Sequence, residues 1–427
     1  MSGQPSAGGA APTGGGGPRL VVLSRVFPNA AQPAYGVFVR ERMSRVAEHL
    51  PVTVVAPVPW FPGQGLLRRW RPGYRPWVAY RERQAGVEVL HPRFLCLPGL
   101  LKPLDGLLLA LGAWPVMRRL ARQGRLEVID AHFIYPDGVA ARLLGRWLRR
   151  PYTLTLRGTI HRIARTRLRR RLAQRALADA AAVFAVSASL RRIAVELGCP
   201  PARIEVVANG ASLERFFPED REACRAELGL PADARVLITV GTLNERKGFH
   251  RVIEQLPALL EREPRLRYLA VGGGSPDGDE ERQLREQAAR LGVADRVHFT
   301  GEVAPARLRR YYSAADLFVL ATRFEGWANV FLEAAACGLP TVTTDVGGNA
   351  EVIAAPWLGR LVPFGDGPAL RRAILEALEA PWDREAIVAY ARRNGWEARI
   401  PRLVERLRGL AGEAAIAPAA GEGARQR

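Results

Sequence analysis

The chain has 427 residues, of which 48% are hydrophobic and 24% are charged. That length exceeds one ordinary core and suits two domains, and the balance excludes a disordered or fibrous protein. The formal net charge of +20 is uneven, because residues 1–207 hold 32 Lys and Arg against 11 Asp and Glu, whereas residues 208–427 hold 30 against 31. We therefore expect an anionic partner for the N-terminal half, such as a phosphorylated ligand, an acidic lipid surface or a nucleic acid.

The cysteines and the apolar segments point to a cytoplasmic location. Four scattered cysteines form no C-x-x-C pair, which argues against a disulfide framework and fits a reducing compartment. No secretory signal is visible, and the most apolar stretch, residues 104–117, is too short to span a bilayer and is expected to be a buried or interfacial helix.

Short apolar runs rich in β-branched residues alternate with helical patterns, first in residues 19–187 and again in residues 234–380. This alternation is typical of βα units that build a parallel sheet, so we predict an α/β fold with two tandem αβα domains. Ligands of such sheets bind beyond the carboxyl ends of the strands. The boundaries we expect are a disordered tail at 1–17, a first domain at 18–207, a second at 208–388, helices that pack back toward the first domain at 389–411, and a disordered tail at 412–427.

The segment EGWANVFLEAAACGLP, residues 325–340, carries two glutamates, Glu325 and Glu333, around the start of a predicted helix. Asn329 can cap this helix, and Gly338 followed by Pro340 can end it. A helix N-terminus attracts anions, so the amides of Trp327, Ala328 and Asn329 could face a phosphate while the carboxylates hold the hydroxyls of the same ligand.

Two further glycine-rich turns lead from predicted strands into helices. Lys247 lies in GTLNERKGF, residues 241–249, just before a glycine and a new helix, where it can reach a diphosphate. The second turn is DVGGNAEVI, residues 345–353. Three such junctions in one domain favour a site for a nucleotide diphosphate.

The ordered set of KG, V-x-F-x-G, EGW with LEA-x-A-CG-LP, and GG-x-x-E resembles the retaining glycosyltransferase family 4, of the GT-B fold. The N-terminal half resembles the same family in YGVFVRE (35–41), DAHFIYPDG (130–138), TLRGT (155–159) and NGASLERFFP (209–218). The resemblance covers roughly residues 19–410 and implies two Rossmann-like domains that face each other across a cleft. The first domain would bind the acceptor and the second a nucleotide-sugar donor such as a UDP- or GDP-sugar.

The resemblance also implies roles for individual residues. Glu325 would contact donor-sugar hydroxyls, Glu333 would bind the ribose, and Lys247 would neutralise the diphosphate. His132 would face donor and acceptor, and Gly36 would let the backbone approach the phosphates. The full set of expected donor-side residues is Gly36, Arg246, Lys247, Val303, Glu325, Gly326, Trp327, Ala328, Asn329 and Glu333, with His132, Lys247 and Glu325 as the catalytic group.

Some positions depart from the family pattern. Thr242 stands where an arginine often assists Lys247, so phosphate binding would depend on Arg246 or another cation. Tyr35, Ile160 and Ser212 also replace residues that are common in the family. These departures concern details of the site and not the class of protein.

We expect no metal ion and no cofactor. Asp277-Gly278-Asp279 has the D-x-D form found in some metal-dependent glycosyltransferases, but it lies in an acidic, glycine-rich segment that reads as a solvated loop. No cluster of His, Asp and Glu has metal-ligand spacing. A metal-independent, retaining transfer is therefore the predicted reaction.

The acceptor and membrane side is predicted in the basic half. Residues 68–83 interleave tryptophans and tyrosines with arginines, and residues 162–180 form a basic helical pattern. Both suit anionic lipid headgroups, which places the protein peripherally at the inner face of the plasma membrane. The residues expected on this side are Arg157, Arg68, Arg69, Trp70 and Arg71.

We thus predict transfer of a sugar to a saccharide or lipid-linked acceptor in cell-surface polysaccharide synthesis. A nucleotide-sugar epimerase or phosphorylase of the same fold is the first alternative. A nucleic-acid-binding protein is the second, although no helix-turn-helix, zinc finger or RNA-recognition signature is present and we expect no nucleic-acid partner.

Overall fold

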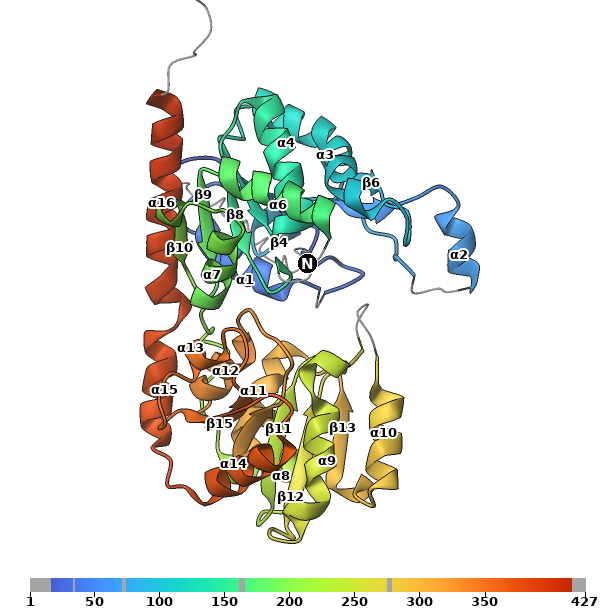
Figure 1. Ribbon diagram of the computed structural model, residues 1–427, viewed down its shortest axis with the longest axis vertical. Helices are drawn as coiled ribbons and strands as arrows, with labels where there is room; N and C mark the ends of the chain where they lie inside the picture. The colour runs from blue at the N-terminus through green and yellow to red at the C-terminus, as the bar shows by residue number, and fades with distance from the viewer. Residues whose placement is uncertain (1–16, 34, 71–73, 161–165, 275–278, 417–427) are drawn as a thin grey trace, which may run out of the picture. The chain divides into compact units, whose positions relative to one another are not determined.

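The computed structural model describes residues 17–33, 35–70, 74–160, 166–274 and 279–416 (Figure 1). The chain divides into two compact units. The first unit comprises the described residues up to Ala185 together with Ile193–Glu205 and the residues from Ile400 onward. The second comprises Val186–Arg192 and Val206–Arg399.

The first unit is built on an eight-stranded sheet of order β10-β9-β8-β7-β1-β2-β5-β4, in which only the β4–β5 pair is described as antiparallel. A separate parallel pair, β3–β6, lies beside it. Its strands are β1 (Leu20–Leu23), β2 (Val52–Val55), β3 (Val58–Trp60), β4 (Arg81–Gln84), β5 (Val87–Leu90), β6 (Arg93–Leu95), β7 (Val128–His132), β8 (Tyr152–Leu156), β9 (Ala182–Ala185) and β10 (Ile204–Val206).

Helices cover this sheet because their apolar faces are buried on it. The predicted apolar helix at 104–117 forms the longer α3, whose buried face includes Leu109, Ala113 and Met117. The helical segments of the first unit are α1 (Val37–Ala47), α2 (Gln64–Trp70), η1 (Lys102–Leu104), α3 (Asp105–Arg122), η2 (Ile134–Gly138), α4 (Val139–Leu148), α6 (Arg167–Asp179), α7 (Ala188–Glu196, shared with the second unit), η3 (Pro201–Arg203) and α16 (Trp396–Ile416, from Ile400 onward).

The second unit is built on a six-stranded parallel sheet of order β13-β12-β11-β14-β15-β16. Its strands are β11 (Arg235–Val240), β12 (Leu266–Val271), β13 (Val297–Gly301), β14 (Leu317–Leu320), β15 (Thr341–Thr344) and β16 (Gly359–Val362). Its helical segments are α8 (Arg221–Glu227), η4 (Glu245–Lys247), α9 (Phe249–Leu260), α10 (Glu281–Arg290), η5 (Ala294–Arg296), α11 (Pro305–Ala314), α12 (Asn329–Ala336), α13 (Asn349–Val352), α14 (Gly367–Glu379) and α15 (Arg384–Arg393).

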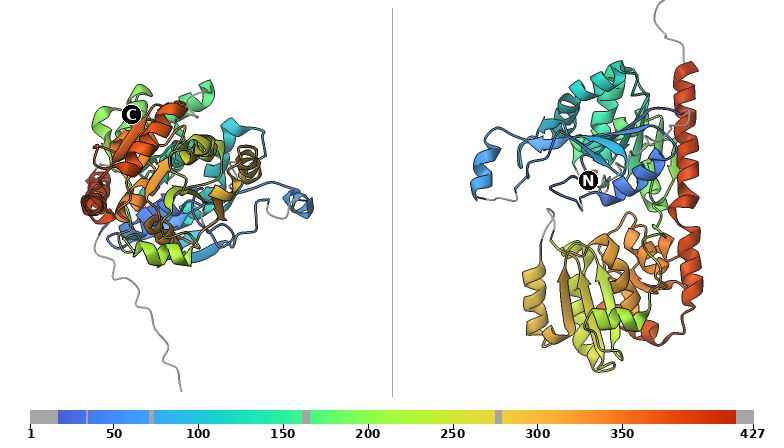
Figure 2. Two further views of the ribbon diagram at one scale, coloured as in Figure 1. Left: turned by 90° about the horizontal axis from the view of Figure 1, so that it is seen from below. Right: turned by 180° about the vertical axis from the view of Figure 1, so that it is seen from behind.

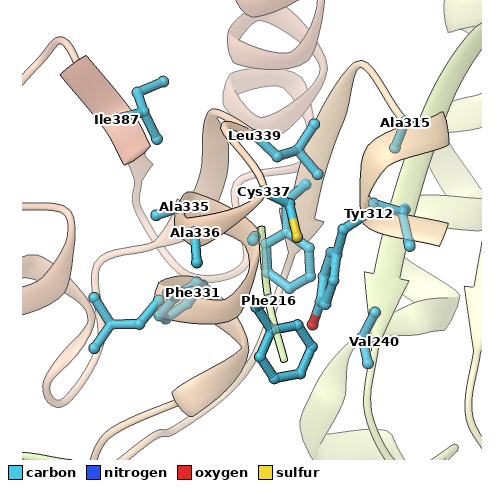
Figure 3. Packing of buried hydrophobic residues seen from close by; sticks show 14 of the residues in the cluster. Phe216, Val240, Tyr312, Ala315, Phe331, Ala335, Ala336, Cys337, Leu339 and Ile387 are labelled. Atoms are coloured by element: carbon cyan, nitrogen blue, oxygen red, sulfur yellow. The ribbon is translucent and has the colours of Figure 1, made fainter. Parts of the chain in front are cut away.

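Helices cover both faces of this second sheet, so successive side chains of β11 enter different cores. Val236, Ile238 and Val240 join one cluster, while Leu237 joins the other. Figure 3 shows the first cluster, in which Tyr312 and Phe216 pack beside Cys337 at the end of α12. Burial on both faces explains why these strands are continuous apolar runs.

The chain order reverses once in each sheet. In the second unit the chain passes from β11 through β12 to β13 on one side and then restarts at β14 on the other, so the reversal falls between β11 and β14. In the first unit the corresponding reversal falls between β1 and β7. Loops diverge at such a point, and it is where open α/β sheets bind ligands.

The structure differs from three of the expected boundaries. Residues 186–192 belong to the second unit, because both carboxylate oxygens of Glu351 accept backbone hydrogen bonds, from Ala188 at 2.6 Å and Ser189 at 2.8 Å. Residues 389–399 also remain with the second unit, because Ala391 of α15 is buried in its core. The helix α16 continues to Ile416, so residues 412–416 are helical and not a tail.

None of the described helices combines the length and the apolar character that crossing a bilayer requires. The terminal segments 1–16 and 417–427, for which we predicted tails, lie outside the described residues.

Candidate functional site

Three loops leave the carboxyl ends of neighbouring strands in the second unit. The loop after β11 carries Arg246 and Lys247, the loop after β14 carries Glu325, and the third follows β15. They are joined by backbone hydrogen bonds, from Arg323 N to the Arg246 carbonyl at 2.8 Å and from Gly348 N to the Glu325 carbonyl at 3.0 Å. The loops therefore form one preorganised edge at the reversal of the sheet.

At the centre of this edge a single carboxylate oxygen meets two cations. Glu325 Oε1 lies 2.7 Å from Lys247 Nζ and 2.6 Å from Arg246 Nη1, and the hydroxyl of Thr322 lies 3.3 Å away. Burial alone would raise the pKa of Glu325, but Lys247 and then Arg246 outweigh it and hold that pKa below its ordinary value. Glu325 is therefore a carboxylate at neutral pH, and it can accept hydrogen bonds but not donate a proton.

The exposure of the two cations differs. The side chain of Lys247 is 12% exposed and packs over Gly241, whereas that of Arg246 is 43% exposed. Asn244 Oδ1 accepts a hydrogen bond from the Lys247 backbone amide at 3.3 Å and so starts the short turn that presents the lysine. Because the Arg246 guanidinium is partly exposed, it can turn toward a ligand at a small cost in free energy. Lys247 and Arg246 can therefore exchange the Glu325 carboxylate for another anion.

The third loop lies close against the second because Gly347 in the third loop has no side chain. Gly347 has φ 57°, and a Cβ there would lie 1.9 Å from the Glu325 carbonyl oxygen. Only glycine combines that conformation with that approach. This observation explains why the GG turn of residues 345–353 follows β15.

The predicted capping role of Asn329 is wrong. Asn329 is the first residue of α12, its N-cap is Ala328, and that cap makes no side-chain hydrogen bond. The carboxamide oxygen of Asn329 instead accepts a hydrogen bond from Asn209 Nδ2 at 3.0 Å, because Asn329 lies one position inside the helix. The predicted end of the helix is confirmed, since Gly338 adopts φ 73° directly after it.

Glu333 lies one turn further along α12 and is half-buried. Tyr312 donates a hydrogen bond from its hydroxyl to Glu333 Oε2 at 3.1 Å. Burial and the Glu333 charge together raise the pKa of Tyr312, so this phenol stays a donor at all ordinary pH. The carboxylate of Glu333 is thus oriented before any ligand arrives.

The other predicted donor-side residues lie on the same edge or near it. Gly326 and Ala328 are buried in the loop before α12, and Trp327 is half-buried with the Arg399 guanidinium 5.5 Å from its ring centre. Val303 follows β13 and packs against the core of the second unit. Thr242 accepts a hydrogen bond from Asn244 Nδ2 at 2.9 Å and so supports the turn that carries Lys247.

In the first unit the strand β7 ends at His132, which is fully buried. Its Nδ1 accepts a hydrogen bond from Arg157 Nη2 at 3.1 Å, which leaves the ring proton on Nε2. That nitrogen lies 3.2 Å from Asp130 Oδ2, although the N–H is not aligned for a hydrogen bond. Burial lowers the pKa of His132 to about 4 despite Asp130, with Arg157 and Arg42 adding to the effect. His132 is therefore neutral at physiological pH.

Arg157 and Gly36 belong to the same part of the first unit. The Arg157 guanidinium lies 4.7 Å from the ring centre of Phe38 in the first turn of α1, and Arg157 is only 5% exposed. Arg157 is therefore not part of the exposed basic surface, because it is held between α1 and β7. Gly36 has φ 83° at the N-cap of α1, and a Cβ there would lie 2.5 Å from the Val26 carbonyl oxygen. Its missing side chain thus serves a close approach within the unit itself.

The predicted surface residues lie on α2. Trp70 is 82% exposed, Arg69 is exposed, and the Arg68 guanidinium donates hydrogen bonds to the Arg75 carbonyl. Figures 1 and 2 show α2 standing away from the sheet of its own unit. Arg71 lies outside the described residues, as do residues 162–165 of the predicted basic helix, whose remainder forms α6.

The D-x-D segment contributes no described ion cluster. Asp277 and Gly278 lie outside the described residues, and Asp279 Oδ1 accepts a hydrogen bond from Glu281 N at 3.2 Å at the start of α10. Within the described ranges, no three His, Cys, Asp or Glu side chains stand together as a metal-binding group. All four cysteines are free and buried.

The sequence did not predict several residues that contact and orient the candidate site residues. Thr322 lies three residues before Glu325 and contacts both Glu325 and the Arg246 carbonyl, so the TRFEG segment contained a local signal. Tyr312 lies 21 residues before Glu333, and Asp130 contacts His132 and Thr153 inside the first sheet. No pattern in the sequence indicates the contacts of Tyr312 and Asp130, because these contacts arise from helix packing and strand register.

Comparison with solved structures identifies the architecture as a GT-B fold of two Rossmann-like domains. Sucrose-phosphate synthase from Thermosynechococcus elongatus superimposes with a TM-score of 0.74 at 22% identity, covering 92% of this chain and 100% of that one. At that level of identity the likeness concerns the fold. The α/β class and the two-domain organisation predicted above are thereby confirmed.

Two family models match consecutive parts of the chain. The model of Glycosyltransferase Family 4 matches residues 71–215, and that of Glycosyl transferases group 1 matches residues 220–394. Among curated relatives, the D-inositol 3-phosphate glycosyltransferase of Corynebacterium urealyticum is 34% identical over 307 residues, covering 66% of this chain and 72% of that protein. TuaC of Bacillus subtilis, a candidate glycosyltransferase of teichuronic acid biosynthesis, is 30% identical over 344 residues, covering 78% and 82%.

The chain therefore belongs to the group 1 glycosyltransferases with a family 4 N-terminal domain. The match to some relatives is shorter. The chain spans about half the length of the D-inositol 3-phosphate glycosyltransferase 2 of Catenulispora acidiphila, with 38% identity over 210 residues and 49% of that protein covered.

Proposed function

We propose that the protein transfers a sugar, with retention of anomeric configuration and without a metal ion, from a UDP- or GDP-sugar to a phosphate-bearing acceptor. The single observation that carries the donor half of this proposal is the Lys247–Glu325–Arg246 cluster at the reversal of the second sheet. Family membership favours transfer over epimerisation, phosphorolysis or nucleic-acid binding.

The two cations stabilise the leaving group in this reaction. As the bond between the anomeric carbon and the diphosphate breaks, negative charge grows on the diphosphate oxygens, and Lys247 and Arg246 lie where they can receive it. Groups that are already positioned for such charge need no reorganisation at the moment of reaction. Glu325 pairs with both cations in this structure, so we expect donor binding to replace the carboxylate by phosphates.

Glu325 then accepts hydrogen bonds from the donor-sugar hydroxyls. Its pKa lies below the ordinary value, so it remains an acceptor throughout the reaction. Glu333, already oriented by Tyr312, takes the hydroxyls of the ribose. The acceptor oxygen attacks the anomeric carbon from the face that the diphosphate leaves, and the departing phosphate oxygen takes the acceptor proton. That course retains the configuration without an enzymic nucleophile.

The first unit provides the acceptor side of the proposal. Residues 1–207 carry the whole excess of positive charge, which suits an acceptor with a phosphate group. A lipid-linked saccharide of cell-surface polysaccharide synthesis is our first candidate, supported by the exposed Trp70 beside basic residues on α2. A soluble polyol phosphate is the second, supported by the names of relatives that act on D-inositol 3-phosphate.

The same surface supports peripheral attachment at the inner face of the plasma membrane. Leu66 and Leu67 of α2 are 61% and 42% exposed, next to Arg69. Apolar side chains at the interface with arginines on lipid phosphates are typical of such attachment. A cytoplasmic location follows from this proposal.

Thermal unfolding in the presence of a panel of nucleotide sugars tests the donor half. With EDTA present, UDP, GDP and their glucose or mannose conjugates are added in turn, and at least one should raise the Tm by several degrees, because a ligand at about 100 times its Kd stabilises by roughly 2.7 kcal/mol. The shift should vanish in Lys247→Ala and persist in Arg262→Ala, an exposed cation of the same unit. If no nucleotide or nucleotide sugar shifts the Tm, the donor assignment is wrong.

The acceptor is then identified with the best donor. Release of nucleoside diphosphate is measured with a lipid-linked saccharide in one arm and with inositol phosphate in the other. NMR of the product linkage reports whether the anomeric configuration of the donor is retained. An inverted linkage, or activity that EDTA abolishes, would contradict the proposed mechanism.

A further inference from the structure

The second unit contains a pocket of about 540 Å³ that the donor site does not use. It lies among α8, α11, the end of α12 and the start of α15. The pocket is lined in part by Arg221, Ser313, Cys337, Gly338, Arg384 and Val388. Figure 3 shows the neighbouring core, with Cys337 at the end of α12 and Ile387 on α15. Its volume falls within the range of small-molecule sites.

The pocket lies at the opposite edge of the sheet from the donor residues. Ser313 and Asp316 precede β14, and Cys337 and Gly338 precede β15, whereas Glu325 and Gly347 follow these strands. A strand of four residues extends on the order of 13 Å. A ligand in this pocket and a nucleotide at the donor edge can therefore be bound together.

Positive charge gathers around one carboxylate, that of Asp316, which lies behind the pocket lining in contact with Arg221 and Arg384. Asp316 accepts a hydrogen bond from Arg221 Nη1 at 3.0 Å on one oxygen and from Arg225 Nη2 at 2.7 Å on the other. Arg225 is buried and also donates to the carbonyls of Ala314 and Ala232, so it is a structural residue behind the pocket lining. Asp316 neutralises one of these two cations and leaves the other in excess.

Arg384 adds a further cation. Among the described residues its hydrogen bonds go to the carbonyls of Gly338 and Asp316, each at 3.4 Å. The carboxylate charge that acts on it is that of Asp316, which already pairs with Arg221 and Arg225. Burial, followed by repulsion from Arg221, lowers the pKa of Arg384 to about 10 although Asp316 opposes the shift. The positive charge of this partly buried guanidinium is poorly balanced by negative charge, so binding an anion would stabilise it.

The acidic side chains at the pocket do not supply that anion. Glu219 is engaged by Arg309 at 2.7 Å, and Glu385 is exposed on the first turn of α15. Ser313 Oγ accepts a hydrogen bond from Glu219 N at 3.0 Å, so its hydroxyl proton can be donated into the pocket. Arg392 stands exposed at the rim and adds another positive charge.

We propose that this pocket binds a small molecule that carries a phosphate group. Arg221 and Arg384 hold the phosphate, Ser313 donates a hydrogen bond to it, and Val388 with Pro218 borders the rest of the ligand. Guanidinium groups that converge with a hydroxyl are the chemistry that selects a phosphate. The site is independent of the proposed transfer reaction.

Calorimetric titration of the full chain with inorganic phosphate tests this site at constant ionic strength. Saturating UDP is included to occupy the donor edge, and one equivalent of phosphate should still bind. Arg384→Gln should weaken phosphate binding at least about tenfold, as expected for the loss of one charge-assisted contact. The exposed Arg372→Gln on α14, with the same loss of charge, should bind phosphate as the parent does.

Two more variants keep the test decisive. Val388→Phe fills the pocket but keeps its arginines, so it should abolish phosphate binding even if Arg384→Gln does not fold. Lys247→Ala should leave phosphate binding at this pocket unchanged. Phosphate that is displaced by UDP, lost in Lys247→Ala, or bound equally by Arg384→Gln and the parent would overturn the proposal.

Discussion

The two units place charged clusters at equivalent points of their sheets, where the chain order reverses, but they build these clusters differently. In the first unit Asp130, His132 and Arg157 are 1%, 0% and 5% exposed and contact one another inside the domain. In the second unit Glu325 is buried, while the side chain of its partner Arg246 is 43% exposed.

This difference separates a scaffold from a site that can exchange partners. A cluster whose members all lie inside the domain fixes the ends of its strands, and any change of charge there is costly. A cluster with an exposed cation can release its internal carboxylate when phosphates arrive. We therefore propose that the second cluster carries the ligand chemistry and that the first cluster fixes the strand ends of its own unit.

The largest expected effect is that of Lys247→Ala. Removing the less exposed cation should lower kcat/KM by about 10² to 10³, as for other groups that stabilise developing charge. Steady-state kinetics with the best donor measures the change, and Arg262→Ala serves as the matched control. If kcat/KM stays near that of the parent, Lys247 does not stabilise the departing diphosphate, and Arg246 alone would neutralise it.

His132→Gln tests whether the first cluster is structural, through its pH dependence. The pKa of His132 is lowered from 6.5 to about 4 in the folded state, so the unfolded chain binds more protons between these values and stability rises with pH in that window. The shift corresponds to roughly 3 kcal/mol as an upper limit.

The difference in stability between parent and His132→Gln should therefore be larger at pH 7 than at pH 4. Denaturant unfolding at a series of pH values measures it, and nucleotide binding to the second unit should be unchanged at pH 7. A difference that is constant from pH 4 to pH 7 would show that His132 does not titrate as a buried neutral group.

Glu325→Gln tests whether the Glu325 carboxylate competes with nucleotide phosphates for Lys247 and Arg246. The variant should bind UDP or GDP at least as tightly as the parent, because the carboxylate no longer competes for Lys247 and Arg246. Turnover of the full donor should fall by roughly 10- to 100-fold, as a charge-assisted hydrogen bond to the sugar is lost. Parallel losses of nucleotide affinity and turnover would refute the separate role of this glutamate.

Glu333→Ala should act on the nucleotide itself. Loss of the ribose contacts should raise the Kd of free nucleotide and of intact donor alike, by roughly tenfold. Calorimetry with UDP and GDP measures both values, and Tyr312→Phe should show a smaller effect, because it removes only the orienting hydrogen bond at 3.1 Å. Unchanged nucleotide affinity in Glu333→Ala would exclude the ribose assignment.

The smallest expected effect belongs to the surface of the first unit. Arg69→Gln should weaken binding to acidic vesicles by about 1 kcal/mol, or roughly fivefold, and high salt should weaken binding further. Vesicle sedimentation measures it, with Arg372→Gln as a control of equal charge change. Equal binding to neutral and acidic vesicles would remove the electrostatic part of the membrane proposal.

Much of the fold followed from local pattern. The alternating pattern that we found in residues 234–380 includes the apolar runs 234–241, 266–273 and 317–322, which form β11, β12 and β14, because strands buried on both faces are continuous apolar runs. Strands β4 and β5 were not predicted, since β4 is a mostly polar strand at the edge of its sheet and its pattern resembles a surface loop. The extension of α16 past residue 411 was also missed, because its alanines and glycines resemble a tail.

The two αβα domains, the order of the motifs and the family to which the chain belongs could all be inferred from the amino-acid sequence. It placed Glu325 and Lys247 among the site residues, but their 2.7 Å contact joins positions 78 residues apart and exists only because β11 and β14 are neighbours. Only the packing of the folded chain buries His132 inside its domain, brings the Tyr312 hydroxyl to Glu333, and places Arg384 near Arg221 and Asp316. Periodicity reports which side chains are buried, whereas electrostatic interactions depend on distances that only the packed chain sets.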